Sequence, residues 1–187
     1  NNRLMPCIDA KINGKKEKMM FDLGSTTLFS VTEKSAKKHD TEKALEIIGG
    51  GTEGGNGTIK ESIYVLNSGK VEIKNFYYSN KPVYYTSTNN ESLIGNPIVK
   101  DYIVTLNFKD DEMYFLPIEP AEEGWMNYGF TLKYDDGKTK IATLLKGSAA
   151  EKAGLSIDDI IEEINGKKIE CLDFCECKKS YGTLLEG

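Results

Sequence analysis

The sequence predicts a mainly β protein with two modules, a strand-rich first module and a small α+β module after it. Short runs rich in Val, Ile, Tyr and Phe recur along residues 1–118, bounded by Gly, Asn and Pro. Asn-Gly dipeptides at 13–14 and 165–166 are typical of tight hairpin turns. After residue 139 the pattern changes to strand, short helix, strand and hairpin.

The first module begins with a hairpin. Residues 4–24 hold two strand-like runs joined at Asn13-Gly14, and the second run ends at Asp22. Ser30 and Glu33 have the spacing of a capping box, which predicts a short helix within residues 30–40. Further strands are expected within residues 58–66, 70–79, 81–86, 92–108 and 112–118.

The composition changes at "PIEPAEEGW", which has no clear period and predicts a linker over residues 119–124. The first domain is therefore expected to span residues 1–118 and the second residues 125–187. In the second domain, Ser148 and Glu151 form another capping box and Gly154 is expected to end that helix.

Charge and cysteine spacing exclude several function classes. The net charge is -5 with interspersed signs, so no basic face is predicted and nucleic acid is not expected as a partner. The sequence contains no run of 18 apolar residues, so no membrane span is predicted. The spacing of Cys171, Cys175 and Cys177, with His39 far away, does not fit a structural zinc site. Neither a metal nor a cofactor is expected.

Residues 49–57, "GGGTEGGNG", formally contain G-x-G-x-x-G. A dinucleotide site would need a helix after the glycines, but a strand-like run follows, and no Gly-Lys-Ser/Thr is present for a phosphate loop. The segment is therefore predicted to be either an ordinary flexible loop or a lid over a cleft.

The segments "FDLGSTTLFSV" and "SLIGNPIVKDYIVTLNFKDDEMYFLP", with the glycine-rich loop between them, resemble the retropepsin-like aspartic peptidases over residues 4–118. The resemblance implies a closed β-barrel or sheet lobe with a short helix. It also implies that Asp22 is the catalytic aspartate, that Gly24 permits the turn and that Ser25 hydrogen-bonds the carboxylate. The implied flap comprises Gly50, Gly51, Thr52, Glu53, Gly54 and Gly55, and the implied supporting turn comprises Leu93, Ile94 and Gly95.

Two carboxylates are needed for this chemistry, because neighbouring carboxylates share one proton while one activates water and the other donates to the substrate carbonyl. The chain has a single D-x-G-S loop. The second aspartate is therefore expected from a homodimer mate or from a lobe upstream of Asn1, and the substrate is expected to be a peptide or unfolded protein.

Leu23 departs from the family, which has a hydroxyl residue there that bonds to the partner loop. Two alternatives stay open: Asp22 is catalytic, or it only forms a turn in a silent peptide-binding scaffold.

The segment "NYGFTL" followed by "KIATLLKGSAAEKAGLSIDDIIEEINGKKI" resembles a bacterial PDZ domain over residues 125–187, truncated before its last strand. Such domains bind a peptide as an added strand and hold its terminal carboxylate with backbone N–H groups. The implied peptide-binding residues are Tyr128, Gly129, Phe130, Thr131, Leu172 and Cys175. The alternative is a small domain that only braces the first one. Peptidases paired with PDZ domains imply a periplasmic or extracellular location.

Overall fold

The computed structural model describes residues 5–54, 57–66, 69–118 and 128–169, which divide into two units. The first unit contains Asn1–Leu45 and Ile63–Met126, and the second contains Glu46–Ser62 and Asn127–Gly187. The predicted mainly β class is confirmed, with only short helices among these residues. The predicted linker at residues 119–124 lies outside the described residues.

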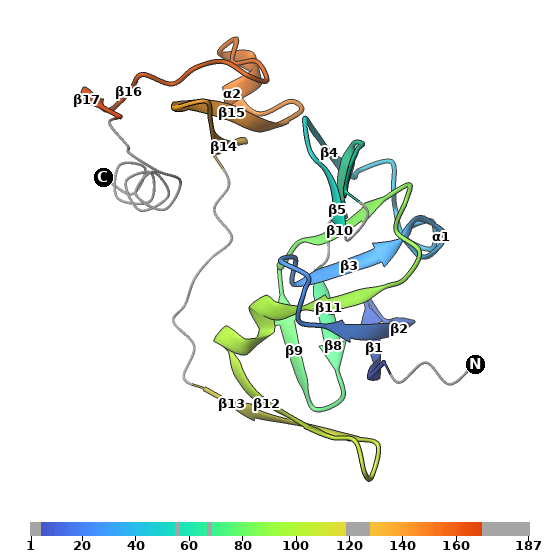
Figure 1. The fold of residues 1–187 in the computed structure, drawn as a ribbon. Helices are drawn as coiled ribbons and strands as arrows, with labels where there is room; N and C mark the ends of the chain where they lie inside the picture. Colours follow the sequence, from blue (N-terminus) through green and yellow to red (C-terminus); the bar gives the residue numbers. More distant parts are fainter. Residues whose placement is uncertain (1–4, 55–56, 67–68, 119–127, 170–187) are drawn as a thin grey trace. The chain divides into compact units, whose positions relative to one another are not determined.

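Most strands of the first unit form one sheet in the order β7-β10-β3-β11-β2-β1-β8-β9. In chain order these are β1 (Cys7–Ile12), β2 (Lys15–Asp22), β3 (Phe29–Thr32), β7 (Ile63–Leu66), β8 (Lys70–Ile73), β9 (Phe76–Ser79), β10 (Val83–Thr86) and β11 (Leu93–Gly95). Figure 1 shows β11 lying between β3 and β2. Strand β11 runs parallel to β2 and antiparallel to β3, so a late segment of this unit is inserted beside the strand that ends at Asp22.

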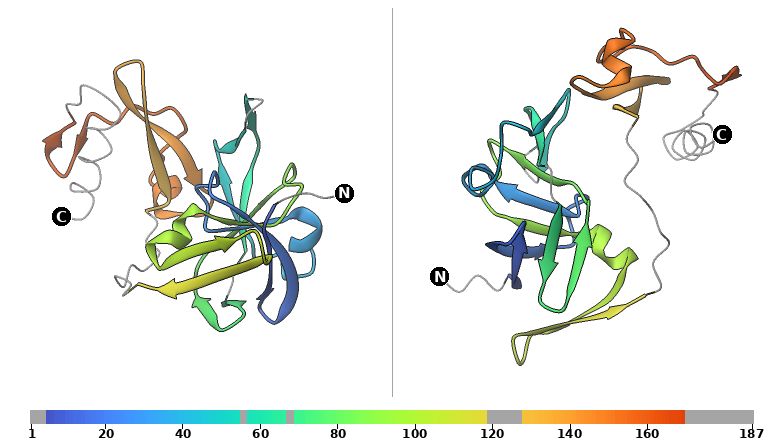
Figure 2. Two further views of the ribbon diagram at one scale, coloured as in Figure 1. Left: turned by 60° about the horizontal axis from the view of Figure 1, so that its bottom comes forward. Right: turned by 180° about the vertical axis from the view of Figure 1, so that it is seen from behind.

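This sheet is open, so the expectation of a closed barrel is wrong. Closure requires continuous pairing around the barrel, and among the described strands β7 and β9 do not pair with each other. The last two strands, β12 (Tyr102–Asn107) and β13 (Glu112–Pro117), form a separate two-stranded sheet after the short 3-10 helix η1 (Asn96–Lys100). Figure 2 shows this hairpin from two further directions.

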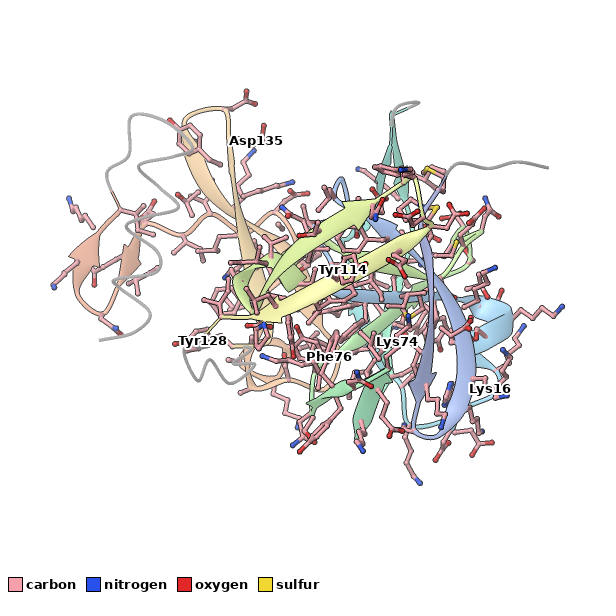
Figure 3. The ribbon with its side chains drawn as sticks, turned by 90° about the horizontal axis from the view of Figure 1, so that it is seen from below. Lys16, Lys74, Phe76, Tyr114, Tyr128 and Asp135 are labelled. Atoms are coloured by element: carbon pink, nitrogen blue, oxygen red, sulfur yellow. The ribbon has the colours of Figure 1, made fainter. Side chains whose placement is uncertain are left out.

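Alternating side chains place the core of the first unit on one face of the sheet. Ile8, Ala10 and Ile12 are buried on β1, while the residues between them are exposed. The β1–β2 turn is formed by Asn13 and Gly14, whose φ angles of 48° and 79° confirm the predicted turn chemistry. Figure 3 labels Lys16 just after this turn. The β12–β13 hairpin packs its inward residues, including Val104 and Phe115, against the same core.

The expected capping residue of the first helix is wrong. Helix α1 (Glu33–Ala36) is capped by Thr32, whose side chain accepts a hydrogen bond from the Ser35 backbone N–H at 3.1 Å. Ser30 instead stays within β3, buried and paired with Leu93. Tertiary pairing therefore moves the start of the helix two residues along the chain.

Glu17 on β2 connects three segments of the first unit. Its carboxylate accepts hydrogen bonds from the Ser35 hydroxyl, from the Ser92 hydroxyl at 2.8 Å and from the Lys38 ammonium at 3.1 Å. Burial alone would raise the pKa of Glu17, but the bonds from Ser35, Ser92 and Lys38 outweigh it and lower the pKa. The ionised form therefore stabilises the packing of α1, and of the segment before β11, against β2.

We expect Glu17→Gln to lower the free energy of unfolding by about 1–3 kcal/mol at neutral pH, because charge-assisted hydrogen bonds are lost. A lowered pKa contributes stability above the ordinary value of 4.5, and this contribution is lost as the pH falls through the folded-state pKa. Urea unfolding at pH 7 and pH 3 measures this, and the difference between parent and variant should shrink at pH 3. An equal difference at both pH values would contradict the assignment.

In the second unit, neighbouring strands of the main sheet follow the order β14-β15-β4. The elements of this unit are β4 (Leu45–Ile48, with Glu46 onward in this unit), β5 (Gly51–Gly54), β6 (Gly57–Lys60), β14 (Phe130–Asp135), β15 (Lys138–Leu145), α2 (Ala149–Lys152), β16 (Glu163–Ile164) and β17 (Lys167–Lys168). Strands β5 and β6 pair as a hairpin, and so do β16 and β17.

Two predictions for the second unit are confirmed. Ser148 caps α2 by accepting a hydrogen bond from the Glu151 N–H at 3.2 Å, and Gly154 follows the helix with a φ of 92°. Asn165 and Gly166 form the turn between β16 and β17, with φ angles of 52° and 77°. Within the described parts of the chain, no helix is long and apolar enough to cross a membrane.

Candidate functional site

Strand β2 ends at Asp22, next to residues that are buried in the core. Phe21, the residue before it, is buried and pairs with the fully buried Ile94 of β11. The next pair in the same register joins Asp22 to Gly95. Because β2 and β11 are parallel here, the chain leaves the sheet at Asp22 beside the supporting segment 93–95.

A tight turn fixes the carboxylate of Asp22. Its Oδ1 accepts a hydrogen bond from the Gly24 backbone N–H at 2.8 Å, and its backbone carbonyl accepts one from the Ser25 N–H at 3.2 Å. A Cβ on Gly24 would lie 3.2 Å from the same Oδ1, which is a tight contact. Glycine at this position therefore lets the backbone approach the carboxylate closely.

The supporting segment packs directly on the loop that follows Asp22. Gly95 donates its N–H to the Leu28 carbonyl at 2.9 Å, and Asn96 donates its N–H to the Ser25 carbonyl at 2.9 Å. A Cβ on Gly95 would collide with the Thr27 carbonyl oxygen and would lie 2.8 Å from the Ser25 carbonyl oxygen. Residue 95 must therefore be glycine for the loop to keep this position.

The hydroxyl of Ser25 makes hydrogen bonds other than the expected one to the Asp22 carboxylate. Its hydroxyl accepts a hydrogen bond from the Thr27 N–H at 3.3 Å and is placed to donate to the Thr27 carbonyl at the same distance. The local turn thus occupies the hydroxyl that was expected to bond the carboxylate, which is instead bonded by the Gly24 N–H. Sequence reasoning missed Thr27 and Asn96, which contact this loop through their backbone atoms and so carry no side-chain signal.

Leu23 is 55% exposed, although it is a large apolar residue next to the carboxylate. The side chains of Phe21 and Ile94 pack in the core beneath the loop, so this part of the core is filled without the side chain of Leu23. An apolar side chain offers no hydrogen bond to a partner loop.

The glycine-rich segment forms the β5–β6 hairpin, in which Gly51 pairs with Lys60 and Gly54 with Gly57. Gly50 lies just before β5, Thr52 and Glu53 lie within it, and Gly55 lies outside the described residues. This hairpin belongs to the second unit, whereas Asp22, Gly24, Ser25 and residues 93–95 are brought together in the first.

The predicted peptide-binding loop leads into β14 of the second unit. Gly129 has a φ of 90°, its carbonyl accepts a hydrogen bond from the Leu145 N–H at 2.7 Å, and a Cβ on it would lie 2.5 Å from the Ser148 Cβ. Phe130 and Thr131 begin β14, which pairs with β15. Figure 3 labels Tyr128 just before β14 and Asp135 at its far end.

Among the strands that the structure describes, β14 pairs with β15 alone, so its second edge has no partner strand there. Leu172 and Cys175 lie outside the described residues, as do the other cysteines of that segment. In the described ranges, no group of three or more His, Cys, Asp or Glu residues is placed to hold a metal ion.

Comparisons with known proteins find a PDZ domain in the second part of the chain. The model of the PDZ domain family matches residues 119–173. The search of curated proteins finds no match.

Solved structures similar to this chain include a retropepsin-like aspartic protease from Rickettsia conorii, with 20% identity, a TM-score of 0.39 and coverage of 56% of this chain and 75% of that one. The EIAV protease complexed with the inhibitor HBY-793 has 15% identity and a TM-score of 0.39, covering 53% and 88%. The retroviral protease-like domain of Ddi1 from Leishmania major has 16% identity and a TM-score of 0.39, covering 60% and 94%.

Proposed function

We propose that this chain is an aspartic peptidase in which Asp22 supplies one of two carboxylates, and that its PDZ domain binds peptide segments. The observation that carries the proposal is the fixed carboxylate of Asp22, bonded by the Gly24 N–H on a loop that Gly95 supports. The second aspartate comes from another aspartate-bearing lobe, either a homodimer mate or a lobe outside this chain.

The reaction follows from two carboxylates that share one proton. The ionised carboxylate takes a proton from water, whose oxygen attacks the peptide carbonyl carbon, while the protonated carboxylate donates its proton to the carbonyl oxygen. The tetrahedral intermediate then collapses, the C–N bond breaks and the nitrogen leaves with a proton returned by the carboxylates. The Gly24 N–H contributes by holding Asp22 in one orientation throughout.

The second candidate function is a silent peptide-binding scaffold, and exposed Leu23 is the observation that favours it. Without a hydroxyl at this position, the two aspartate-bearing loops lack a hydrogen bond that would hold the two carboxylates together. A location in the periplasm or outside the cell stays a prediction that rests on resemblance alone.

The experiment that separates the two functions is incubation of the chain with denatured proteins from pH 3 to pH 7, followed by mass spectrometry of new termini. New termini that are absent with Asp22→Asn support the peptidase. Binding of peptides without any new termini selects the scaffold.

We expect Gly129→Ala to weaken binding of peptides with a free C-terminal carboxylate by about tenfold or more. Alanine is strained at a φ of 90°, and its Cβ would collide with Ser148, which caps α2. Fluorescence anisotropy of labelled peptides measures the affinity. Gly147→Ala is the matched control, since its φ is 75° and a Cβ there meets no atom within 4 Å. Equal loss in both variants would mean that backbone strain alone explains the effect.

A further inference from the structure

Leu23 is a large apolar residue beside Asp22 to which the proposed reaction gives no role. Its side chain is 55% exposed, although it directly follows the residue that carries the carboxylate. A single exposed leucine elsewhere on a protein surface would need no explanation. The position of Leu23 is informative because the proposed reaction requires a second carboxylate to approach Asp22.

The turn that fixes the carboxylate also exposes Leu23. Met19 and Phe21 are buried on one face of β2, and an uninterrupted strand would bury residue 23 on the same face. The strand ends at Asp22 instead, where the Gly24 N–H donates to the Asp22 Oδ1 at 2.8 Å. The exposure of Leu23 and the fixed orientation of the carboxylate therefore have the same cause.

Backbone hydrogen bonds hold the loop that carries Leu23. The Asn96 N–H donates to the Ser25 carbonyl and the Gly95 N–H donates to the Leu28 carbonyl, both at 2.9 Å. The close packing at Gly95, where a Cβ would collide with the loop, shows that this support is in direct contact. Two loops that are already held in this way lose little ordering entropy when they meet.

The proposed reaction brings Leu23 against the loop of the partner. Two carboxylates that share one proton lie about 3 Å apart. Adjacent Cα atoms lie about 3.8 Å apart, so the side chain of Leu23 comes within contact reach of the loop that carries the second carboxylate. When that loop belongs to another copy of this chain, two-fold symmetry places equivalent residues near the axis opposite each other. Leu23 then faces Leu23 of the partner subunit.

We propose that Leu23 packs against Leu23 of the partner subunit and that this apolar contact, in place of a hydrogen bond, holds the two Asp22 loops together. The contact rests on the proposed function, because it assumes that the two carboxylates meet. It favours a second copy of this chain as the partner, since a polar group facing a leucine would lose its hydrogen bond to water without gaining another. Leu23 is a positioning residue and takes no part in the chemistry.

Sedimentation equilibrium of Leu23 variants tests the contact. Leu23→Ala removes apolar area from the interface of both copies and should raise the dissociation constant of the dimer by about tenfold or more. Leu23→Met keeps the volume and the apolar character, so its dissociation constant should stay within about threefold of the parent. Leu45→Ala is the matched control, because Leu45 is 44% exposed and lies outside the candidate site. It should dimerise like the parent.

Cysteine substitution locates the contact. In a background in which the four natural cysteines are replaced by serine, Leu23→Cys should form a disulfide between two copies under mild oxidation. Bridged cysteines have Cα atoms about 4.4–6.8 Å apart, so a disulfide requires the two loops to meet at this residue. Leu45→Cys in the same background should stay unbridged at the same protein concentration. Mass spectrometry of unreduced peptides identifies the bridge.

Cleavage measured against protein concentration separates the association of the loops from folding. In Leu23→Ala, the concentration that gives half of the maximal rate per chain should rise about tenfold, in step with the dissociation constant. The maximal rate should stay within about threefold of the parent. A loss of folded protein would instead lower the rate by the same factor at every concentration.

The contact would be overturned by an unchanged dissociation constant in Leu23→Ala, by a parent chain that stays monomeric, or by a dimeric Leu23→Cys chain that forms no disulfide. If the dimer depends on Leu23 but no sample cleaves a fluorogenic peptide, the contact stands and the proposed peptidase function fails. If the parent cleaves as a monomer, the contact fails and the proposed peptidase function stands.

Discussion

Replacing Asp22 by asparagine is expected to lower the kcat for peptide cleavage by about a thousandfold or more, because an amide cannot accept the proton of the attacking water. The amide oxygen of asparagine can still accept the Gly24 N–H, so the loop and the stability of the fold should be retained. Initial rates on a fluorogenic peptide and a thermal unfolding curve measure the two effects separately.

Asp9→Asn is the matched control, since Asp9 is an exposed aspartate on β1 outside the candidate site. It should cleave at the parent rate. If Asp22→Asn retained the parent rate, Asp22 would be only a turn former. If it lost stability as well as activity, the loss of activity could not be assigned to chemistry.

Gly95→Ala is expected to lower the free energy of unfolding by about 3 kcal/mol and to abolish cleavage. The new methyl group would collide with the Thr27 carbonyl oxygen and would lie 2.9 Å from the Ser25 Oγ. Backbone atoms cannot rotate away as a flexible side chain can, so the loop that begins at Asp22 must move. Urea unfolding and initial rates measure the two losses.

Gly69→Ala is the control for the general effect of adding a methyl group. A Cβ there meets only the Asn13 Oδ1, at an ordinary contact distance of 3.5 Å. Its free energy of unfolding should stay within about 0.5 kcal/mol of the parent. If Gly95→Ala were equally mild, the supporting segment would not hold the loop.

Local chemistry explains which parts of the fold could be predicted. The Asn13-Gly14 and Asn165-Gly166 turns need left-handed backbone at both positions, and these residue types adopt it at low cost. The Ser148 cap follows from the same kind of local bonding. Ser30 fails as a cap because its pairing with Leu93 and its burial outweigh its local preference.

Only the parts of the candidate site that lie in short sequence motifs could be predicted. Asp22, Gly24 and residues 93–95 were implied by the resemblance of two short motifs to the retropepsin-like aspartic peptidases, and the collision at Gly95 explains why the second motif needs its glycine. The grouping of residues 46–62 with the second unit has no local signal. It depends on pairs such as Glu46 and Lys146, which lie 100 positions apart in the chain.

The most direct test of a site shared between two aspartates is to mix parent and Asp22→Asn chains at constant total concentration and to measure the cleavage rate. If the second aspartate comes from a second copy, only pairs with two parent chains are active, and an equal mixture should retain about one quarter of the parent rate. A rate of about one half, which falls in proportion to the parent fraction, would contradict a site completed by a second copy.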